Sequence, residues 1–330
     1  MPKTLPLPLR ERLRQNEPLS RHTTLRIGGP ADLFLAVENE EELIAAVCWA
    51  REQSLPCLLL GGGSNVLVAD EGVRGLVVAN RAHGWRQREA ISYQLSGIGH
   101  PASCILHLAS CILHLASCVP LSRLARATIG QGLAGLEWAV GIPGTVGGAI
   151  VGNAGAHGGC MADSLIAVRV LDDDGEVREL AAEELGLGYR SSVFKGQGLG
   201  DRGKGIILSA EIALQPGERQ ELEARAAAYL AQRRRTQPKG LSAGSVFRNP
   251  PGDFAGRLIE AAGLKGACHG GAVIAEKHAN FIINRGGATA ADVLALMALA
   301  RQRVLERFGV TLELEIELVG NGPLPIQANA

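Results

Sequence analysis

The feature that most constrains this chain is a glycine-rich stretch near its middle, Gly141-Ile-Pro-Gly-Thr-Val-Gly-Gly-Ala-Ile-Val-Gly-Asn-Ala-Gly-Ala-His-Gly-Gly159. Eight of its nineteen residues are glycine, and it contains no charged side chain. Ordering so much glycine costs conformational entropy, so the folded protein must use the missing side chains. One use is the close approach of backbone N–H groups to a bulky anion, such as a cofactor pyrophosphate. A flexible linker is the alternative, but linkers lack interleaved apolar residues such as Val146 and Ile150.

Composition limits the class of protein. The 330 residues suffice for two or three domains with cores of their own. Apolar residues make up 46%, and 33 basic residues balance 33 acidic ones, which argues against a disordered chain and against bulk attraction to nucleic acid or membranes. No secretory signal or membrane span is visible, and seven cysteines fit reduced thiols. The sequence therefore predicts a cytoplasmic protein that binds neither nucleic acid nor membrane.

The first part of the chain has the pattern of an α/β unit. After a polar, loosely packed lead-in over residues 1–20, we expect a strand at 32–37, a helix at 40–53 and an apolar strand at 57–60. The last of these runs directly into Gly61-Gly-Gly-Ser-Asn65. A strand that ends in a glycine turn is typical of α/β units that present backbone amides at a strand's C-terminal end.

Periodicity and turn signals predict the remaining elements. We expect strands at 66–68, 76–78, 165–171, 176–180, 206–214 and 280–283, and helices at 121–131, 218–236, 255–262 and 289–308. The last strand is predicted from strict alternation of two sets of side chains, namely Leu312, Leu314, Ile316 and Leu318 on one face and Glu313, Glu315 and Glu317 on the other.

A perfect seven-residue repeat precedes the predicted helix at 121–131. Ala-Ser-Cys-Ile-Leu-His-Leu occupies 102–108 and again 109–115, and Ala-Ser-Cys returns at 116–118. One heptad of spacing allows an apolar helical face. The repeat also spaces cysteines and histidines like metal ligands, but duplication reproduces any spacing automatically. We therefore interpret 102–118 as an apolar insertion or an irregular segment, and expect no metal site.

By themselves these patterns predict an α/β protein that binds a phosphate-bearing cofactor, and they do not name its reaction. Six segments together do more. They are His22-Thr-Thr-Leu-Arg-Ile-Gly-Gly-Pro30, Gly61-Gly-Gly-Ser-Asn65, the stretch from Gly135 to Gly159, Tyr189-Arg-Ser-Ser192, Gly244-Ser-Val-Phe-Arg-Asn-Pro250 and Leu264-Lys-Gly266. In this order and spacing, over about residues 20–320, the chain closely resembles the UDP-N-acetylenolpyruvoylglucosamine reductase family, in its shorter, type II-like form.

The resemblance implies an α+β fold. A two-subdomain FAD-binding module of the vanillyl-alcohol-oxidase type (also called PCMH) would comprise residues 1–80 and 81–215. An α/β substrate-binding domain would follow at 216–330, with the last strand at 311–320 packing back on the first subdomain. It implies non-covalent FAD, NADPH as reductant, and reduction of UDP-N-acetylglucosamine enolpyruvate to UDP-N-acetylmuramate for peptidoglycan synthesis.

The resemblance also implies roles for individual residues. Arg190 would stabilise negative charge that develops on the substrate, Ser245 would donate a proton to the α-carbon, and Glu315 would assist that protonation. By pattern alone Glu315 shares a polar strand face with two other glutamates, and only the resemblance distinguishes it. Substrate binding is implied for Tyr189, Asn249 and Lys265. Flavin binding is implied for Arg26, Gly28, Gly61, Gly62, Gly63, Ser64, Asn65, Gly141, Ile142, Pro143, Gly144, Thr145, Gly147, Gly148, Asn153, Ala154 and Gly155.

One departure from the family pattern leaves an alternative open. The duplicated segment stands where the family has an Ala-Gly-Ala-like strand end before Pro120. The alternative to a monomeric reductase is therefore a non-catalytic or flavin-deficient homologue, disrupted by the duplication at 102–118.

Overall fold

The structure is a computed structural model, and it describes residues 4–88, 111–195 and 205–320. These residues form two compact units. Among the described residues, one unit combines 4–81 with 233–320, and the other combines 82–88 and 111–195 with 205–232. The three-part division into 1–80, 81–215 and 216–330 stays a prediction.

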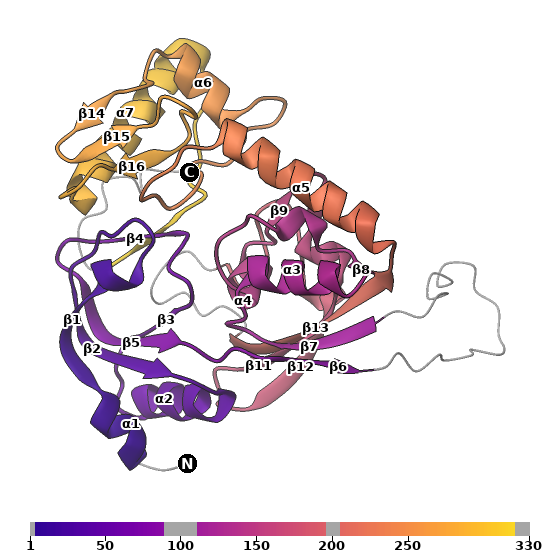
Figure 1. Ribbon diagram of the computed structural model, residues 1–330. Coiled ribbons are helices and arrows are strands. Elements are labelled where there is room, and N and C mark those ends of the chain that lie inside the picture. The colour runs from indigo at the N-terminus through magenta and orange to yellow at the C-terminus, as the bar shows by residue number, and fades with distance from the viewer. Residues whose placement is uncertain (1–3, 89–110, 196–204, 321–330) are drawn as a thin grey trace. The chain divides into compact units, whose positions relative to one another are not determined.

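The first unit begins with a four-stranded sheet of order β1-β2-β5-β3, in which β1 runs antiparallel to β2 while β2, β5 and β3 are parallel. Helix α2 lies against this sheet (Figure 1). The elements are α1 (Leu7–Arg12), β1 (Arg14–Pro18), the 3₁₀ helix η1 (Leu19–His22), β2 (Pro30–Val37), α2 (Glu40–Glu52), β3 (Cys57–Leu60), β4 (Val66–Val68) and β5 (Val73–Asn80).

The beginning of the chain corrects one expectation. Residues 4–20 do not form a loosely packed lead-in, because α1 and β1 occupy much of this segment and β1 pairs with β2. Leu9 and Leu19 are buried, at 2% and 0% exposure. The proline-rich composition concealed this packing, since Pro8 lies in the first turn of α1, where a missing N–H has no helical partner to lose.

The end of the chain completes the first unit. Helices α6 and α7 pack beside the antiparallel sheet β14-β15-β16, while β17 pairs in parallel with β4. Helix α7 begins with a capping box, in which Thr289 and Asp292 each accept a backbone hydrogen bond from the other. The elements are α6 (Ala255–Ala261), β14 (Cys268–His269), β15 (Ala272–Ile274), β16 (Ile282–Asn284), α7 (Ala290–Phe308) and β17 (Glu317–Val319).

The last strand also differs from its prediction. Alternation over 312–318 indicated one continuous strand, but only Glu317–Val319 forms β17. Residues 313–316 instead pair irregularly with the segment that contains Ser245. Because of this, Glu315 is half-buried whereas Glu313 and Glu317 are exposed.

The second unit is built on an antiparallel sheet of order β12-β11-β13-β7-β6, with β8 pairing to β13. Helices α3 and α4 lie over one face of it (Figure 1). The elements are β6 (Trp85–Arg88), β7 (Cys111–Ala116), α3 (Leu121–Gly130), β8 (Leu133–Ala134), η2 (Glu137–Ala139), α4 (Val146–Val151), β9 (Gly155–Ala156), β10 (Gly159–Cys160), η3 (Met161–Asp163), β11 (Leu165–Leu171), β12 (Val177–Ala181), η4 (Ala182–Leu185), β13 (Ile206–Pro216) and α5 (Arg219–Thr236).

Residues 111–115 of the second copy, together with Ala116, form strand β7, which is neither a helical face nor an irregular segment. Cys111, Leu113 and Leu115 are buried in the core, while His114 lies on the other face. Residues three apart on a strand point to opposite faces, so Cys111 and His114 cannot share a metal ion. Cys104 and His107 lie outside the described residues.

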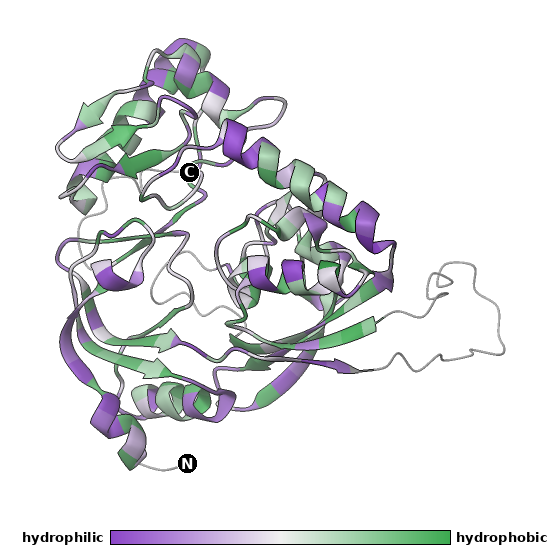
Figure 2. Cartoon of the chain, in the orientation of Figure 1, coloured by the Kyte–Doolittle hydropathy of each residue, from purple (hydrophilic) through white to green (hydrophobic). Residues whose placement is uncertain are grey.

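The hydropathy of the elements agrees with their burial. Figure 2 shows strands β3 and β7 coloured largely hydrophobic, whereas α5 carries long hydrophilic stretches. Only Leu222 and Ala226 of α5 are buried. None of the helices in the described parts of the chain is long and apolar enough to cross a membrane.

Candidate active site

In the first unit, the predicted flavin loop 61–65 packs against the segment that begins at His22. The Thr24 N–H donates to the Gly63 carbonyl at 2.9 Å, and the Thr24 hydroxyl donates to the carbonyl of Ser242 at 2.8 Å. Gly63 has φ +60°, and a Cβ there would lie 2.1 Å from the His22 carbonyl oxygen. Glycine is therefore required at this position by the fold itself.

Two more predicted flavin residues lie in the same segment. Arg26 is exposed with φ 57°, and its guanidinium donates to the Arg21 carbonyl at 2.9 Å. Gly28 packs against strand β4, where a Cβ would lie 2.8 Å from the Cβ of Val68. Gly28 thus lies against β4, and Thr24 of the same segment is hydrogen-bonded to the loop 61–65.

Ser245 and Glu315 come together through the backbone. Ser245 forms a β-bridge with Phe281, while its neighbour Val246 accepts a hydrogen bond from the Glu315 N–H at 2.8 Å. Asn65 joins the same group, because its side-chain amide donates to the Glu315 carbonyl at 3.2 Å and its own carbonyl accepts from the Glu317 N–H at 2.9 Å. The structure therefore connects the predicted flavin loop with two predicted catalytic residues inside one unit.

The predicted substrate-binding residues Asn249 and Lys265 both contact α6. The Asn249 side-chain oxygen accepts from the Ala255 N–H at 3.1 Å, at the start of the helix. The Lys265 ammonium pairs with Glu260 at 2.7 Å, near its end. Nearby, burial lowers the pKa of His278, so the neutral imidazole is favoured beside this cationic side chain.

In the second unit, the glycine stretch uses much of its glycine to pack against protein. A Cβ on Gly159 would lie 2.5 Å from the Trp138 ring, and one on Gly147 would lie 3.0 Å from the Ser117 side chain. Close packing is thus a second use of the missing side chains, and the approach of a ligand to this stretch stays a prediction. Gly148 is exposed, and a Cβ there would meet only the Thr145 hydroxyl oxygen, at 3.5 Å.

The other predicted flavin residues of this stretch form its turns. Gly144 has φ +110° and its carbonyl accepts from the Leu121 N–H, while the Ile142 N–H donates to the Ala139 carbonyl. Thr145 caps α4 by accepting from the Gly148 N–H at 3.3 Å. Gly141 is half-buried, Pro143 is exposed, and the N–H of Ala154 donates to the Ala149 carbonyl at 2.7 Å.

The side chain of Arg190 contacts the same glycine-rich stretch. Its guanidinium donates to the Gly155 carbonyl at 3.1 Å, and its backbone has φ 53°, in the left-handed region. The buried Asn153 donates to the Gly188 carbonyl at 3.0 Å, and the Ser192 hydroxyl donates to the Val151 carbonyl at 2.7 Å. These bonds fix the loop that carries Arg190. Tyr189 is 60% exposed, with its ring centroid 5.6 Å from the Arg190 guanidinium carbon.

The two glycine-rich segments fit a flavin nucleotide in their chemistry. Gly61, Gly62 and Gly148 are exposed, and neither segment contains an acidic residue that would repel a pyrophosphate. Among residues 4–88, 111–195 and 205–320 no cluster of His, Cys, Asp and Glu could hold a metal ion.

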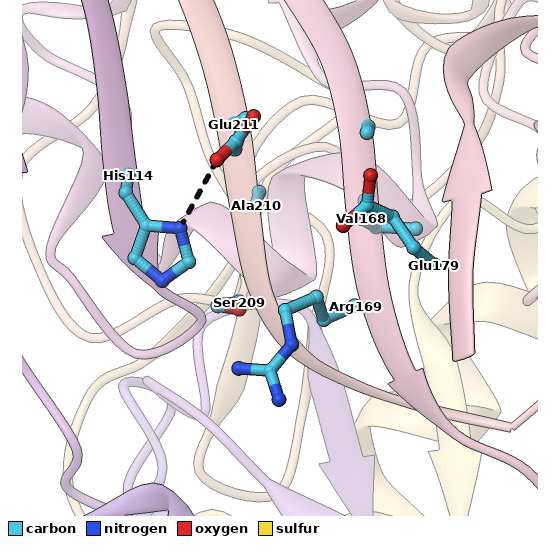
Figure 3. A pocket seen from close by; sticks show the side chains of 8 residues that line it. His114, Val168, Arg169, Glu179, Ser209, Ala210 and Glu211 are labelled. Atoms are coloured by element: carbon cyan, nitrogen blue, oxygen red, sulfur yellow. Dashed lines mark ion pairs between the residues drawn. The ribbon is translucent and has the colours of Figure 1, made fainter. Parts of the chain in front are cut away.

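A small pocket elsewhere in the second unit contains none of the predicted site residues. It lies on the face of the antiparallel sheet that carries His114 (Figure 3). His114 approaches Glu211 at 3.5 Å, and Arg169 and Ser209 extend the polar lining.

Sequence reasoning assigned no role to one residue that contacts the segment of Ser245. Asn280 is buried at 3% exposure, and its side chain forms hydrogen bonds with both the N–H and the carbonyl of Phe247, two residues beyond Ser245. The sequence contained it only as the start of a predicted strand. The available signal was a polar amide at the start of an otherwise apolar strand pattern, because a buried amide needs hydrogen-bond partners.

Comparison with known proteins defines the class first. Residues 31–181 match the family model of the FAD binding domain, and residues 237–319 match that of the UDP-N-acetylenolpyruvoylglucosamine reductase C-terminal domain. With the mixed fold described above, this makes the chain a flavoprotein with an FAD-binding domain of the PCMH type and a reductase C-terminal domain.

Full-length relatives identify the family. UDP-N-acetylenolpyruvoylglucosamine reductase 2 of Symbiobacterium thermophilum is 45% identical over 94% of both chains, and the reductase of Chloroflexus aurantiacus is 43% identical over 96% of this chain and 100% of its own. The crystal structure of the Thermus caldophilus reductase is similar with a TM-score of 0.73 and 38% identity, covering 93% of this chain and 99% of that one. The chain belongs to the UDP-N-acetylenolpyruvoylglucosamine reductase family.

Proposed function

We propose that this protein reduces the enolpyruvyl group of UDP-N-acetylglucosamine enolpyruvate to give UDP-N-acetylmuramate, with NADPH as reductant, in peptidoglycan synthesis. The observation that carries the proposal is the 45% identity to a named reductase over 94% of both chains. The comparisons give no support to a non-catalytic homologue, and the second copy of the repeat forms a regular strand in the antiparallel sheet.

The chemistry that FAD supplies when bound is hydride transfer from NADPH to the β-carbon of the enolpyruvyl double bond. Gly61 to Asn65 and Gly141 to Gly148 would hold the cofactor through backbone groups. One hydride and one proton add across the double bond, so the remaining task of the protein is to stabilise the developing negative charge and to deliver the proton.

We assign these tasks to three residues. Arg190 stabilises charge that builds toward the α-carbon and the substrate carboxylate, since a guanidinium matches a carboxylate in shape and charge. Ser245 donates the proton to the α-carbon. A serine hydroxyl is a very weak acid, so its delivery depends on neighbours, and Glu315 lies on the backbone segment hydrogen-bonded to Val246 beside it.

Substrate binding uses a different chemistry. Lys265 and Asn249 bind the substrate diphosphate through a fixed ammonium and a side-chain amide. In this structure both contact α6, so binding requires Lys265 to exchange Glu260 for phosphate oxygens. Tyr189, with its exposed ring, contacts the substrate beside Arg190.

We place the reaction in the cytoplasm, where nucleotide sugars and NADPH are available, and we expect a monomer. The balanced charge and the family's small-molecule substrates support a self-contained enzyme. Light scattering coupled to gel filtration tests the monomer directly, and a dimer mass would contradict it.

The activity is tested by anaerobic half-reactions on the purified, flavin-loaded protein. NADPH should bleach the flavin absorbance, and UDP-N-acetylglucosamine enolpyruvate should restore it in stoichiometric amount. Bound flavin that NADPH reduces and the substrate does not reoxidise would contradict the proposed function.

The serine assignment makes a sharper prediction. Ser245→Ala should leave flavin reduction by NADPH unchanged, while reoxidation by the substrate slows by about 10²-fold or more, the usual loss when a general acid is removed. Equal slowing of both half-reactions would contradict the role of Ser245 as proton donor. Ser242→Ala is a matched control, because in its contacts with the described residues Ser242 uses its backbone carbonyl, which accepts from the Thr24 hydroxyl.

A further inference from the structure

The segment that carries Ser245 is held between two other segments of the first unit. On one side, the Glu315 N–H donates to Val246 at 2.8 Å and the Arg248 N–H donates to Glu313 at 2.9 Å. On the other side, the Val246 N–H donates to the Asn280 carbonyl at 2.9 Å. The backbone around Ser245 therefore forms the centre of a short irregular sheet.

The side chain of Asn280 strengthens one edge of this arrangement. Its oxygen accepts from the Phe247 N–H at 2.9 Å, and its NH₂ group donates to the Phe247 carbonyl at 2.7 Å. A carboxamide offers both a donor and an acceptor. It can therefore bond to the N–H and the carbonyl of one residue, as the backbone of a neighbouring strand does. Both bonds are buried, which makes each one costly to lose.

Packing fixes the residue that Asn280 binds. Phe247 is 1% exposed and belongs to the core that includes Leu258 and Met297. Its backbone is therefore held by Asn280 and its side chain by the core, two residues from Ser245. Within the described residues, by contrast, the Ser245 hydroxyl itself makes no hydrogen bond that would orient it.

We propose that Asn280 is a positioning residue for Ser245, holding the proton-donating hydroxyl in place by clamping the Phe247 backbone. This inference rests on the proposed function and adds a residue to it. A proton donor must lie within about 2.6–3.2 Å of the atom it serves, and a displacement of about 1 Å can cost about 10²-fold in rate. Without the Asn280 side chain, the segment 245–247 keeps its backbone pairing with residues 280–281 and with 313–316, but the Phe247 N–H and carbonyl lose both of their partners.

The test compares Asn280→Ala with Asn284→Ala in the flavin-loaded protein. Asn284 is the matched control, because it is also buried, also lies in the first unit, and also uses both ends of its amide, donating to the Leu25 carbonyl at 3.0 Å and accepting from Gly286 at 2.8 Å. Loss of either amide should reduce stability, and only Asn280 lies against the Ser245 segment.

The readout is anaerobic stopped-flow absorbance of the two half-reactions, in H₂O and in D₂O. Asn280→Ala should reduce normally with NADPH, reoxidise with substrate about 10²-fold more slowly, and show a larger solvent isotope effect on reoxidation, because proton delivery becomes more limiting. Asn284→Ala should keep the wild-type isotope effect. If Asn280→Ala does not fold, Asn280→Asp keeps the acceptor and the shape, and should show the same enlarged effect.

Three results separate the possible failures. Wild-type protein whose reduced flavin is not reoxidised by the substrate overturns the proposed function, and this inference with it. Normal wild-type turnover with an unchanged isotope effect in both Asn280 variants overturns the inference alone. An equal effect in Asn284→Ala also overturns it, because the loss would then reflect general weakening of the unit.

Discussion

Single residues in this protein carry both structural and chemical roles. Arg190 illustrates the combination, because a left-handed backbone is unusual for arginine and the guanidinium is partly engaged by the Gly155 carbonyl. An arginine has five N–H donors, so it can bond to the protein backbone and to a carboxylate at the same time. The same side chain can therefore orient itself on the protein and bind the substrate.

This geometry predicts that lysine cannot replace Arg190. Arg190→Lys keeps the charge but loses the planar fork, so substrate-dependent reoxidation should slow by about 10²–10³-fold, as for the loss of one transition-state donor. Flavin reduction by NADPH should be unchanged. Stopped-flow absorbance measures both, with the exposed Arg86→Lys as control. Wild-type reoxidation in Arg190→Lys would refute the assignment.

At this scale the sequence predicted roles only through family resemblance. Alternation gave Glu315 the same surroundings as Glu313 and Glu317, and its half-buried position follows from pairing with the segment 246–248, which no local pattern encodes. Asn280 was missed for the same reason. Its partner Phe247 is distant in sequence, and a clamp between them is visible only once the fold brings them together.

Elements were more predictable than residues, because their patterns are local. Helices α2, α3 and α7 and strands β3, β11 and β13 all occur where periodicity indicated them. The exceptions have a physical cause in each case. Strand β1 is polar along much of its length, and β7 lies in a repeat whose seven-residue period resembles a helix while its burial alternates with period two.

The repeat itself supports a prediction at this scale. Deleting residues 102–108 should leave the fold and the half-reactions intact, because residues 111–116, which form the whole of β7, remain. Since the copies are identical, deletion of 109–115 gives the same chain, so the experiment tests the duplication and not one copy. Retained flavin and turnover are the expected result.

A matched variant shows that the test is sensitive. Leu113 is 1% exposed in the core of the second unit, and Leu113→Asp buries a charge there. This variant should lose flavin and unfold at lower temperature, as monitored by differential scanning fluorimetry. Comparable loss in the deletion variant would mean that the extra heptad is needed by the fold.

At the scale of the whole molecule, stability should depend on pH in mild acid. Burial lowers the pKa of His278 below its ordinary value of 6.5, so the unfolded chain binds more protons than the folded one in the window just below 6.5. The stability linked to His278 is therefore fully present above that value and is lost as the pH falls through the lower, folded pKa.

Melting temperatures measured between about pH 7.5 and about pH 5.5 check this, since this is the range in which histidines titrate. The wild-type melting temperature should fall on acidification, and His278→Gln should show a smaller fall. His83→Gln, at an exposed position, should behave like the wild type. An unchanged dependence in His278→Gln would contradict the prediction.

The pairing of β17 with β4 has a consequence for biosynthesis. Among the described strands β17 is the only partner of β4, and about 250 residues of chain separate them, a loop whose closure is slow and entropically costly. During translation the edge of β4 therefore stays unpaired until residues 317–319 have been made, while the second unit, whose residues are all made earlier, can fold first. Nascent chains are accordingly most vulnerable to aggregation or chaperone capture at β4.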